Sequence, residues 1–333
     1  MSPDADGGAV LPPAATPTPT ADPPSAADPP PVTDPPPAAD PPATADRPGW
    51  GGRLSSGSVR AAPASRPPDP SDAAPGWRPK LVALDIDGTI VGFDGWLPDD
   101  VKAVLSRVTA AGVPIVLATG RAWLSAKLVL DELALPWSYC VCNNGATVCT
   151  YPPLAVVQTA TFDARPIVAA LRHHPTAVLA VEEFGVGYRA TGPFPVGELH
   201  GEFRIVGWDE LAPGPVSRII VRDPAATSAE FLDFCRRLDL RELSYFIGWT
   251  NWLDVASADV DKAAGLEVAA DRLGVSRADV LALGDGLNDI ELLAWAGRGV
   301  AMGQAPDALK QVADAVTGAF ADGGAVAELS RWF

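Results

Sequence analysis

The stretch LVALDIDGTI, residues 81–90, joins a short apolar run to two closely spaced acids. Residues 81–84 are all apolar, which is typical of a strand buried on both faces of a parallel sheet. Asp85 and Asp87 follow directly, with one residue between them. Ionised carboxylates are rarely buried unless they are paired or bind a cation. The stretch therefore predicts a buried strand that places two carboxylates at a ligand site beyond its carboxyl end.

Residues 1–78 differ in composition from the rest of the 333-residue chain. The first 79 residues hold 22 of the 35 prolines and no Lys or Glu. Repeats such as ADPPSAADPPPVTDPPPAAD, residues 21–40, cannot bury enough apolar surface to offset the entropy lost on ordering. We expect a disordered, Pro/Ala-rich tail over residues 1–78. A protein partner for this tail is one hypothesis, without further support in the sequence, and an inert solubilising extension is the other.

The charge and the lack of long apolar runs limit the classes of partner. The net charge is −16, and nine Asp and five Arg in the tail leave −12 on residues 79–333. We expect no nucleic-acid partner, because phosphate contacts need clustered Lys and Arg. Neither an apolar run of 18 residues nor a signal-peptide pattern occurs, so we expect no membrane partner. The four cysteines lack zinc-ligand spacing, and we expect reduced thiols in a cytoplasmic protein.

From residue 79 onward, short apolar runs alternate with amphipathic segments. Residues 98–112 begin with Pro, carry early acids and end with Gly, which is typical of a helix. Further strands are expected at 113–120 and 139–146, with a helix at 121–134 between them. Alternating strands and helices with short connections predict an α/β fold with a doubly wound, Rossmann-like parallel sheet.

The alternation stops between about residues 155 and 252. There, strand-like segments follow one another without an intervening helix, which indicates an α+β unit with an antiparallel sheet, inserted as a cap. From residue 252 the alternation of strands and helices returns. The expected domains are the tail at 1–78, the first part of the core at 79–154, the cap at 155–251 and the second part of the core at 252–333.

A second acidic cluster, LALGDGLNDIELL at 281–293, repeats the layout of the first. A buried strand leads into a Gly-rich turn, where Asp285 and Asp289 bracket Asn288. Carboxyl ends of parallel strands share one edge of a sheet, so we expect these acids to meet Asp85 and Asp87 there. Carboxylate oxygens are the ligands that Mg²⁺ prefers, and the sequence predicts a Mg²⁺ site.

Two further elements predict a phosphate site. In LATGR, residues 117–121, Thr119 ends a strand next to Gly120, so a hydroxyl and backbone N–H groups can hold phosphate oxygens. Lys262 is one of only five lysines against twenty arginines, and it starts an expected helix. An ammonium is electrostatically unfavourable at a helix N-terminus, so its position indicates a bound anion.

Taken in order, DIDGT, ATGR, Lys262 and GDGLND resemble the four motifs of the haloacid dehalogenase-like phosphatases. NNGA at 143–146 and GVAMGQAPDALK at 299–310 resemble the Cof-type, class IIB branch of that family. The resemblance covers about residues 79–333, and the expected cap falls between the second and third motifs, as it does in the family.

The resemblance implies a role for each motif residue. Asp85 resembles the nucleophile that forms an aspartyl-phosphate, and Asp87 resembles the general acid/base. Thr119, Gly120 and Lys262 would bind the transferring phosphoryl group. The implied metal set is Asp85, Asp87, Asp285 and Asp289, in which Asp87 contributes its backbone carbonyl and Asp289 supports the site. The residues expected near the substrate are Asn144, Asn288 and Arg121.

These inferences lead to the hypothesis of a Mg²⁺-dependent phosphatase acting on a small phosphorylated metabolite. A sugar phosphate is the first expectation and a phosphorylated cofactor the second, both by analogy with the family. Two alternatives stay open: a phosphomutase that uses the same aspartyl-phosphate, and a non-catalytic binding protein that acts through the tail. An EF-hand loop is excluded, because it needs Glu at its twelfth position, where Trp96 stands.

Overall fold

The computed structural model describes residues 76–238, 240, 243–248, 251–258 and 260–333. Most of the expected tail, at residues 1–75, therefore lies outside the described residues. Trp77 and Arg78, which we assigned to the tail, instead contact the folded core. The Trp77 and Trp332 rings meet edge to face with centroids 5.0 Å apart, and Arg78 Nη1 donates to the Trp332 carbonyl at 2.7 Å. The predicted tail boundary at residue 78 is wrong, because these two side chains have partners in the core.

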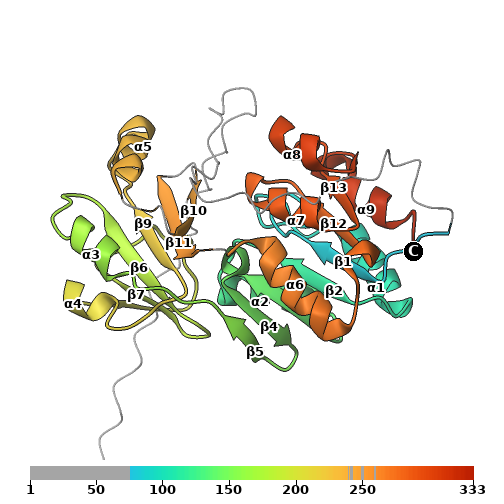
Figure 1. Cartoon of the computed structure of the whole chain (residues 1–333), viewed down its shortest axis with the longest axis horizontal. Coiled ribbons are helices and arrows are strands. Elements are labelled where there is room, and N and C mark those ends of the chain that lie inside the picture. The colour runs from blue at the N-terminus through green and yellow to red at the C-terminus, as the bar shows by residue number, and fades with distance from the viewer. Residues whose placement is uncertain (1–75, 239, 241–242, 249–250, 259) are drawn as a thin grey trace, which may run out of the picture. The chain divides into compact units, whose positions relative to one another are not determined.

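An eight-stranded sheet, here called the core sheet, has the order β14-β13-β12-β1-β2-β3-β4-β5 (Figure 1). The strands from β14 to β3 pair in parallel, and β4 and β5 add an antiparallel edge. The predicted doubly wound α/β fold is confirmed. The bounds are β1 Leu81–Leu84, β2 Ile115–Ala118, β3 Ser138–Cys142, β4 Thr147–Tyr151, β5 Ala155–Thr159, β12 Val280–Gly284, β13 Arg298–Ala301 and β14 Ala315–Val316.

Helices cover both faces of the core sheet, because alternate residues of each strand point to opposite sides. Val82 and Leu84 pack on the face covered by α1, α2 and α9, whereas Leu81 and Ala83 pack on the face covered by α6, α7 and α8. This two-sided burial explains why the strands read as continuous apolar runs. The helices are α1 Asp99–Ala110, α2 Trp123–Leu133, α6 Lys262–Leu273, α7 Ile290–Trp295, α8 Asp307–Val312 and α9 Gly324–Leu329.

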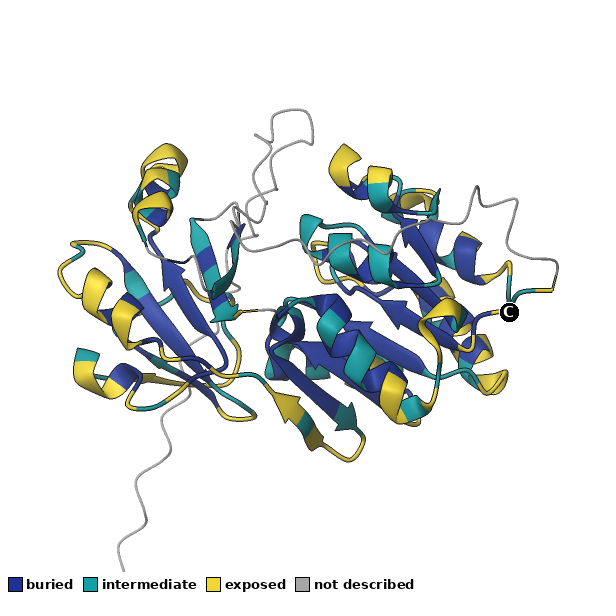
Figure 2. Ribbon diagram, in the orientation of Figure 1, coloured by how far each residue is buried: buried dark blue, intermediate teal, exposed yellow. Residues whose placement is uncertain are grey.

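A six-stranded sheet, here called the cap sheet, has the order β10-β11-β9-β6-β7-β8. All its pairs are antiparallel except β7 with β8. Helices α3, α4 and α5 cover one face over an apolar core, and Figure 2 shows its inner strands buried. The bounds are α3 Arg165–Leu171, β6 Val178–Glu183, β7 Gly187–Ala190, β8 Glu202–Ile205, α4 Trp208–Leu211, β9 Ile219–Arg222, α5 Ser228–Arg237, β10 Leu243–Gly248 and β11 Trp252–Ser257.

Two segments belong to a different sheet from the one we expected. Residues 155–159, assigned to the cap, form β5, which pairs with β4 at the edge of the core sheet. Residues 252–257, assigned to the core, form β11, which pairs with β10 and β9 of the cap sheet. Both assignments are wrong, because a strand's own residue pattern does not identify its hydrogen-bonding partner.

All four cysteines are free and buried. Cys140, Cys142 and Cys149 lie on β3 and β4 of the core sheet, and Cys235 lies on α5 of the cap. The Sγ atoms of Cys140 and Cys142 are 3.4 Å apart. These thiols belong to the apolar clusters of the two sheets.

Candidate active site

Polar residues, most of them predicted, gather beyond the carboxyl ends of four neighbouring parallel strands. Asp85 follows β1, Thr119 follows β2, Asn143 follows β3 and Asp285 follows β12. These four strands are neighbours in the core sheet, in the order β12-β1-β2-β3. A parallel sheet thus brings residues up to 200 positions apart in the sequence to one edge, which is where such folds bind ligands.

Three of the four predicted acids form one cluster. Carboxylate oxygens of Asp85, Asp285 and Asp289 all lie within 4.8 Å of one another. Burial raises the pKa of Asp85 well above its ordinary value, and the neighbouring acids raise it further, while Lys262 lowers it. Burial, together with the charge of Asp289, raises the pKa of Asp285 to about 7. A cation bound between these carboxylates would offset the repulsion between their negative charges.

The donor set fits a hard divalent cation, because it consists of carboxylate oxygens. Gly88 makes room for the Asp285 carboxylate. A Cβ atom at this position would lie 2.1 Å from Asp285 Oδ2, and the glycine φ is +79°. Only glycine lets the Asp285 carboxylate approach the loop that carries Asp85 and Asp87.

Lys262 is fully buried between two of these acids. Its Nζ donates to Asp85 Oδ1 and to Asp289 Oδ1, both at 2.6 Å. Burial lowers the pKa of Lys262, but the charges of Asp289 and Asp85 outweigh it and leave the pKa above its usual value. The side chain is therefore an ammonium. The two carboxylates already explain the position of Lys262 at the start of its helix, which we attributed to a bound anion.

Asp289 has several partners inside the protein. Its Oδ2 accepts from the backbone N–H groups of Asp285 and Gly286 at 3.0 and 2.9 Å, and its Oδ1 accepts from Lys262. It is fully buried. Asp289 thus holds the turn that carries Asp285 and orients the ammonium, in addition to adding negative charge to the cluster.

The Asp87 side chain lies outside the acidic cluster. Its carboxylate forms a two-pronged ion pair with Arg121, at 2.9 Å from Nε and 2.5 Å from Nη2. Such fork-to-fork pairs are among the stronger ion pairs in proteins. The Asp87 side chain therefore lies apart from the three clustered carboxylates and pairs with Arg121, whereas the metal role implied for Asp87 concerns its backbone carbonyl.

The loop after β2 is fixed by its neighbours. The Thr119 N–H donates to the Val141 carbonyl at 2.8 Å, and the buried Thr119 Oγ1 accepts from the Arg121 N–H at 3.0 Å. The Asn144 N–H in turn donates to the Thr119 carbonyl at 3.0 Å. Gly120 leaves space for the Asn144 amide, since a Cβ there would lie 3.1 Å from Asn144 Oδ1.

The chain matches the family model of the haloacid dehalogenase-like hydrolases over residues 82–329. It is a haloacid dehalogenase-like hydrolase. The match spans both parts of the core and the inserted cap, so the predicted family and the prediction of an enzyme are confirmed.

Named relatives of this hydrolase are phosphatases. It is 26% identical to the 5-amino-6-(5-phospho-D-ribitylamino)uracil phosphatase YcsE of Bacillus subtilis, over 76% of this chain and 95% of the relative. It is 28% identical to the pyridoxal phosphate phosphatase YbhA of Escherichia coli, over 72% of this chain and 93% of the relative. A solved subclass IIB sugar phosphatase shares the fold, with a TM-score of 0.64 and 21% identity over 75% of this chain and 98% of that one.

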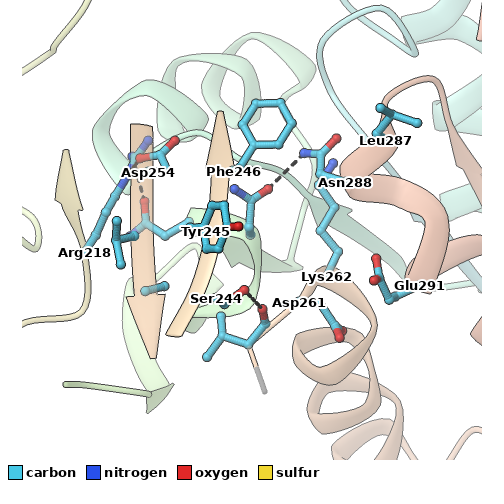
Figure 3. Close-up of a pocket in the computed structure, with 15 residues that line it drawn as sticks. Arg218, Ser244, Tyr245, Phe246, Asp254, Asp261, Lys262, Leu287, Asn288 and Glu291 are labelled. Carbon is cyan, nitrogen blue, oxygen red and sulfur yellow. Dashed lines mark hydrogen bonds and ion pairs between the residues drawn. The ribbon is translucent and has the colours of Figure 1, made fainter. Parts of the chain in front are cut away.

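A cavity of about 50 Å³ lies beside Lys262 in this hydrolase. Figure 3 shows Lys262 and Asn288 on the core side and the β-strands that carry Phe246 and Asp254 on the cap side. Asn288 Nδ2 donates to Asn144 Oδ1 at 2.9 Å across the core side. Other residues that line the cavity are Asn143, Arg218, Ser244, Asp261 and Glu291. The structure thus brings Asn144, Asn288 and Lys262 to one cavity and adds a wall from the cap.

Two residues of this hydrolase site were missed by the sequence analysis, Gln304 and Asn143. Gln304 Nε2 donates to the Gly88 carbonyl at 2.7 Å and to Asp285 Oδ2 at 3.2 Å, and its Oε1 accepts from the Phe320 N–H at 2.9 Å. The available signal for Gln304 was its position two residues after Met302, just past β13.

In the described ranges, no helix is both long and apolar enough to cross a bilayer.

Proposed function

We propose that this hydrolase is a Mg²⁺-dependent phosphatase that cleaves a small phosphomonoester through an aspartyl-phosphate on Asp85. The observation that carries the proposal is the buried contact of Lys262 Nζ with Asp85 Oδ1 at 2.6 Å, inside a cluster of three acids. An ammonium and a cation site beside one carboxylate are what attack on a dianionic phosphate requires, because both offset negative charge.

The Asp85 carboxylate is the proposed nucleophile. One of its oxygens forms a bond to phosphorus while the bond from phosphorus to the alcohol oxygen breaks. Water then attacks the acyl-phosphate, which frees inorganic phosphate and restores Asp85. Lys262, the Thr119 hydroxyl and the Gly120 N–H would hold the phosphoryl oxygens. Bound by Asp85 and Asp285, Mg²⁺ would supply positive charge to the same group.

Asp87 is the proposed proton donor and acceptor. It would give a proton to the departing alkoxide and take one from the attacking water. In the described structure its carboxylate is paired with Arg121. In this proposal Asp87 leaves the pair to reach the leaving group, and Arg121 holds Asp87 aside between turnovers.

Two kinds of small phosphomonoester are candidate substrates. Analogy with the family favours a sugar phosphate, and a structural neighbour is named as a sugar phosphatase. Two relatives are named for phosphorylated compounds with a nitrogen heterocycle, a uracil and pyridoxal phosphate. Phe246 on the cavity wall favours the heterocycle, because an aromatic ring stacks on flat groups.

The test is phosphate release from a panel of sugar phosphates and heterocyclic phosphates, with and without Mg²⁺. We expect release that needs Mg²⁺ and disappears with EDTA. Release that survives chelation would refute the metal dependence, and isomerised sugar phosphate without free phosphate would favour the phosphomutase. The cytoplasmic location and the partner of the tail remain predictions.

A further inference from the structure

Asn143 connects the phosphate-binding loop to the rest of the active-site edge. It follows β3 directly, is 3% exposed and has a φ of +54°. Its N–H donates to the Arg121 carbonyl at 2.9 Å, and the N–H of the next residue donates to the Thr119 carbonyl at 3.0 Å. The backbone at Asn143 therefore fixes the loop at residues 119–121.

The Asn143 side chain points in the other direction, into the cap. Its Nδ2 donates to Glu182 Oε2 at 2.5 Å, and its Oδ1 accepts from Arg218 Nη1 at 3.0 Å. Both cap residues are at least nine-tenths buried, with 8% and 6% exposure. Each end of one carboxamide thus binds a buried charged group of the cap.

The two cap residues lie on the face of the cap sheet that is opposite its helices. Leu179 and Val181 of β6 pack under the helices, so Glu182 points to the other side. Arg218 is held there by Asp254, whose Oδ1 accepts from Arg218 Nε at 2.5 Å. This network has three charged groups, and the carboxamide of Asn143 is its link to the core.

The cavity beside Lys262 is too small for a substrate while these bonds are made. Its volume is about 50 Å³, whereas small-molecule sites hold roughly 300–1,000 Å³. Arg218, Asp254 and Asn143 all line this cavity. Entry of a phosphomonoester therefore requires the cap sheet to move away from Lys262, and the bonds of Asn143 to Glu182 and Arg218 lie in the path of that movement.

We propose that Asn143 is a positioning residue that fastens the cap to the phosphate-binding loop, and that its bonds to Glu182 and Arg218 break when substrate enters. The link that Asn143 makes between the cap and the loop does not depend on which reaction is catalysed, whereas its role in substrate entry rests on the proposed function. Because the same residue holds the loop at 119–121 and the cap, opening the cap loosens the loop that would bind phosphate.

Hydrogen–deuterium exchange tests the fastening by a charge swap. Asn143→Asp puts a carboxylate against the Glu182 carboxylate, and we expect exchange in residues 119–122 and 143–146 to rise about ten-fold. Glu182→Gln alone keeps an acceptor for Asn143, so we expect little change. In the double variant, the new amide at position 182 donates to the new carboxylate at position 143, and we expect exchange to return to within about two-fold of the parent protein.

The matched control is Asn251→Ala. Asn251 has the same φ of +54°, but its Nδ2 donates to the Asp223 and Ala226 carbonyls within the cap, at 3.2 and 2.6 Å. We expect no change in exchange at residues 119–122. The proposal is overturned if the double variant exchanges as fast as Asn143→Asp, or if the control loosens the loop equally.

The KM for the best substrate tests the role in entry. We expect Asn143→Asp to lower KM about ten-fold, because a bond that substrate entry must break is already lost, with kcat within about three-fold, and the double variant to restore KM. Equal KM values in all variants would refute the role in entry. If the parent protein releases no phosphate from any compound, the proposed function fails, and the exchange result still decides the fastening.

Discussion

Replacing the acid at position 285 with its amide, Asp285→Asn, should stabilise the metal-free protein at pH 8. Asp285 is ionised there although burial and, after it, the charge of Asp289 raise its pKa to about 7, against an ordinary value of 3.8. A carboxyl whose pKa is raised on folding does not lower the free energy of unfolding at pH values below its unfolded pKa. The cost grows as the pH rises from the unfolded to the folded pKa, and it is fully present above the folded pKa. The amide has no such charge, and it keeps an oxygen that can accept from Gln304.

The size of the effect follows from the two pKa values. Their difference of about three pKa units corresponds to about 4 kcal/mol at about 1.4 kcal/mol per unit. The carboxyl is partly exposed and shares its repulsion with other acids, so we discount this to roughly 2–4 kcal/mol in the free energy of unfolding at pH 8. In a domain of this size, the gain raises Tm by roughly 5–10 °C.

Thermal unfolding in EDTA, measured between pH 4 and pH 8, checks this prediction. We expect the two proteins to have similar Tm values near pH 4 and to diverge as the pH rises toward 8, with the variant more stable. Added Mg²⁺ should raise the Tm of the parent protein, because a ligand of the folded state stabilises it, and should not raise that of the variant. A variant that is equally or less stable at pH 8 would contradict the proposed cost of burying the Asp285 charge beside Asp289.

Three further predictions concern activity and metal binding. Asp85→Asn should abolish phosphate release while the circular dichroism spectrum stays unchanged, and turnover by this variant would remove Asp85 as the nucleophile. Gln304→Ala should raise the Kd for Mg²⁺ about ten-fold by calorimetry, because Asp285 loses the amide that orients it; an unchanged Kd would show that Gln304 does not act on the metal site. A chain without residues 1–75 should keep kcat and KM within about two-fold, whereas a lost partner with intact turnover would support a binding role for the tail.

The fold and most of the site could be predicted because strand ends determine where side chains gather. Asp85, Lys262 and Asp289 were each recognisable as polar groups at the end or start of an element, and the shared edge of a parallel sheet explains their contact. The contact of Lys262 with Asp85 spans 177 positions in the sequence.

The incorrect and missing predictions have a common physical cause: the sequence around a residue does not show which distant residue or strand it pairs with. The side chain of Asp87 could equally have joined the acids, and its pairing with Arg121, which follows β2, is not visible in the local sequence. Likewise, β5 and β11 have ordinary strand patterns, and only hydrogen bonding to a neighbour assigns each to its sheet. Asn143 was missed because its two partners come from the cap.

Because every cysteine is buried, the order in which the thiols become accessible shows which sheet opens first. Cys140, Cys142 and Cys149 are enclosed by the core sheet and Cys235 by the cap helix α5. An alkylating reagent can reach each thiol only when its own apolar cluster comes apart. The order in which mass spectrometry detects labelled peptides during mild denaturation therefore reports whether the cap unravels before the core or together with it.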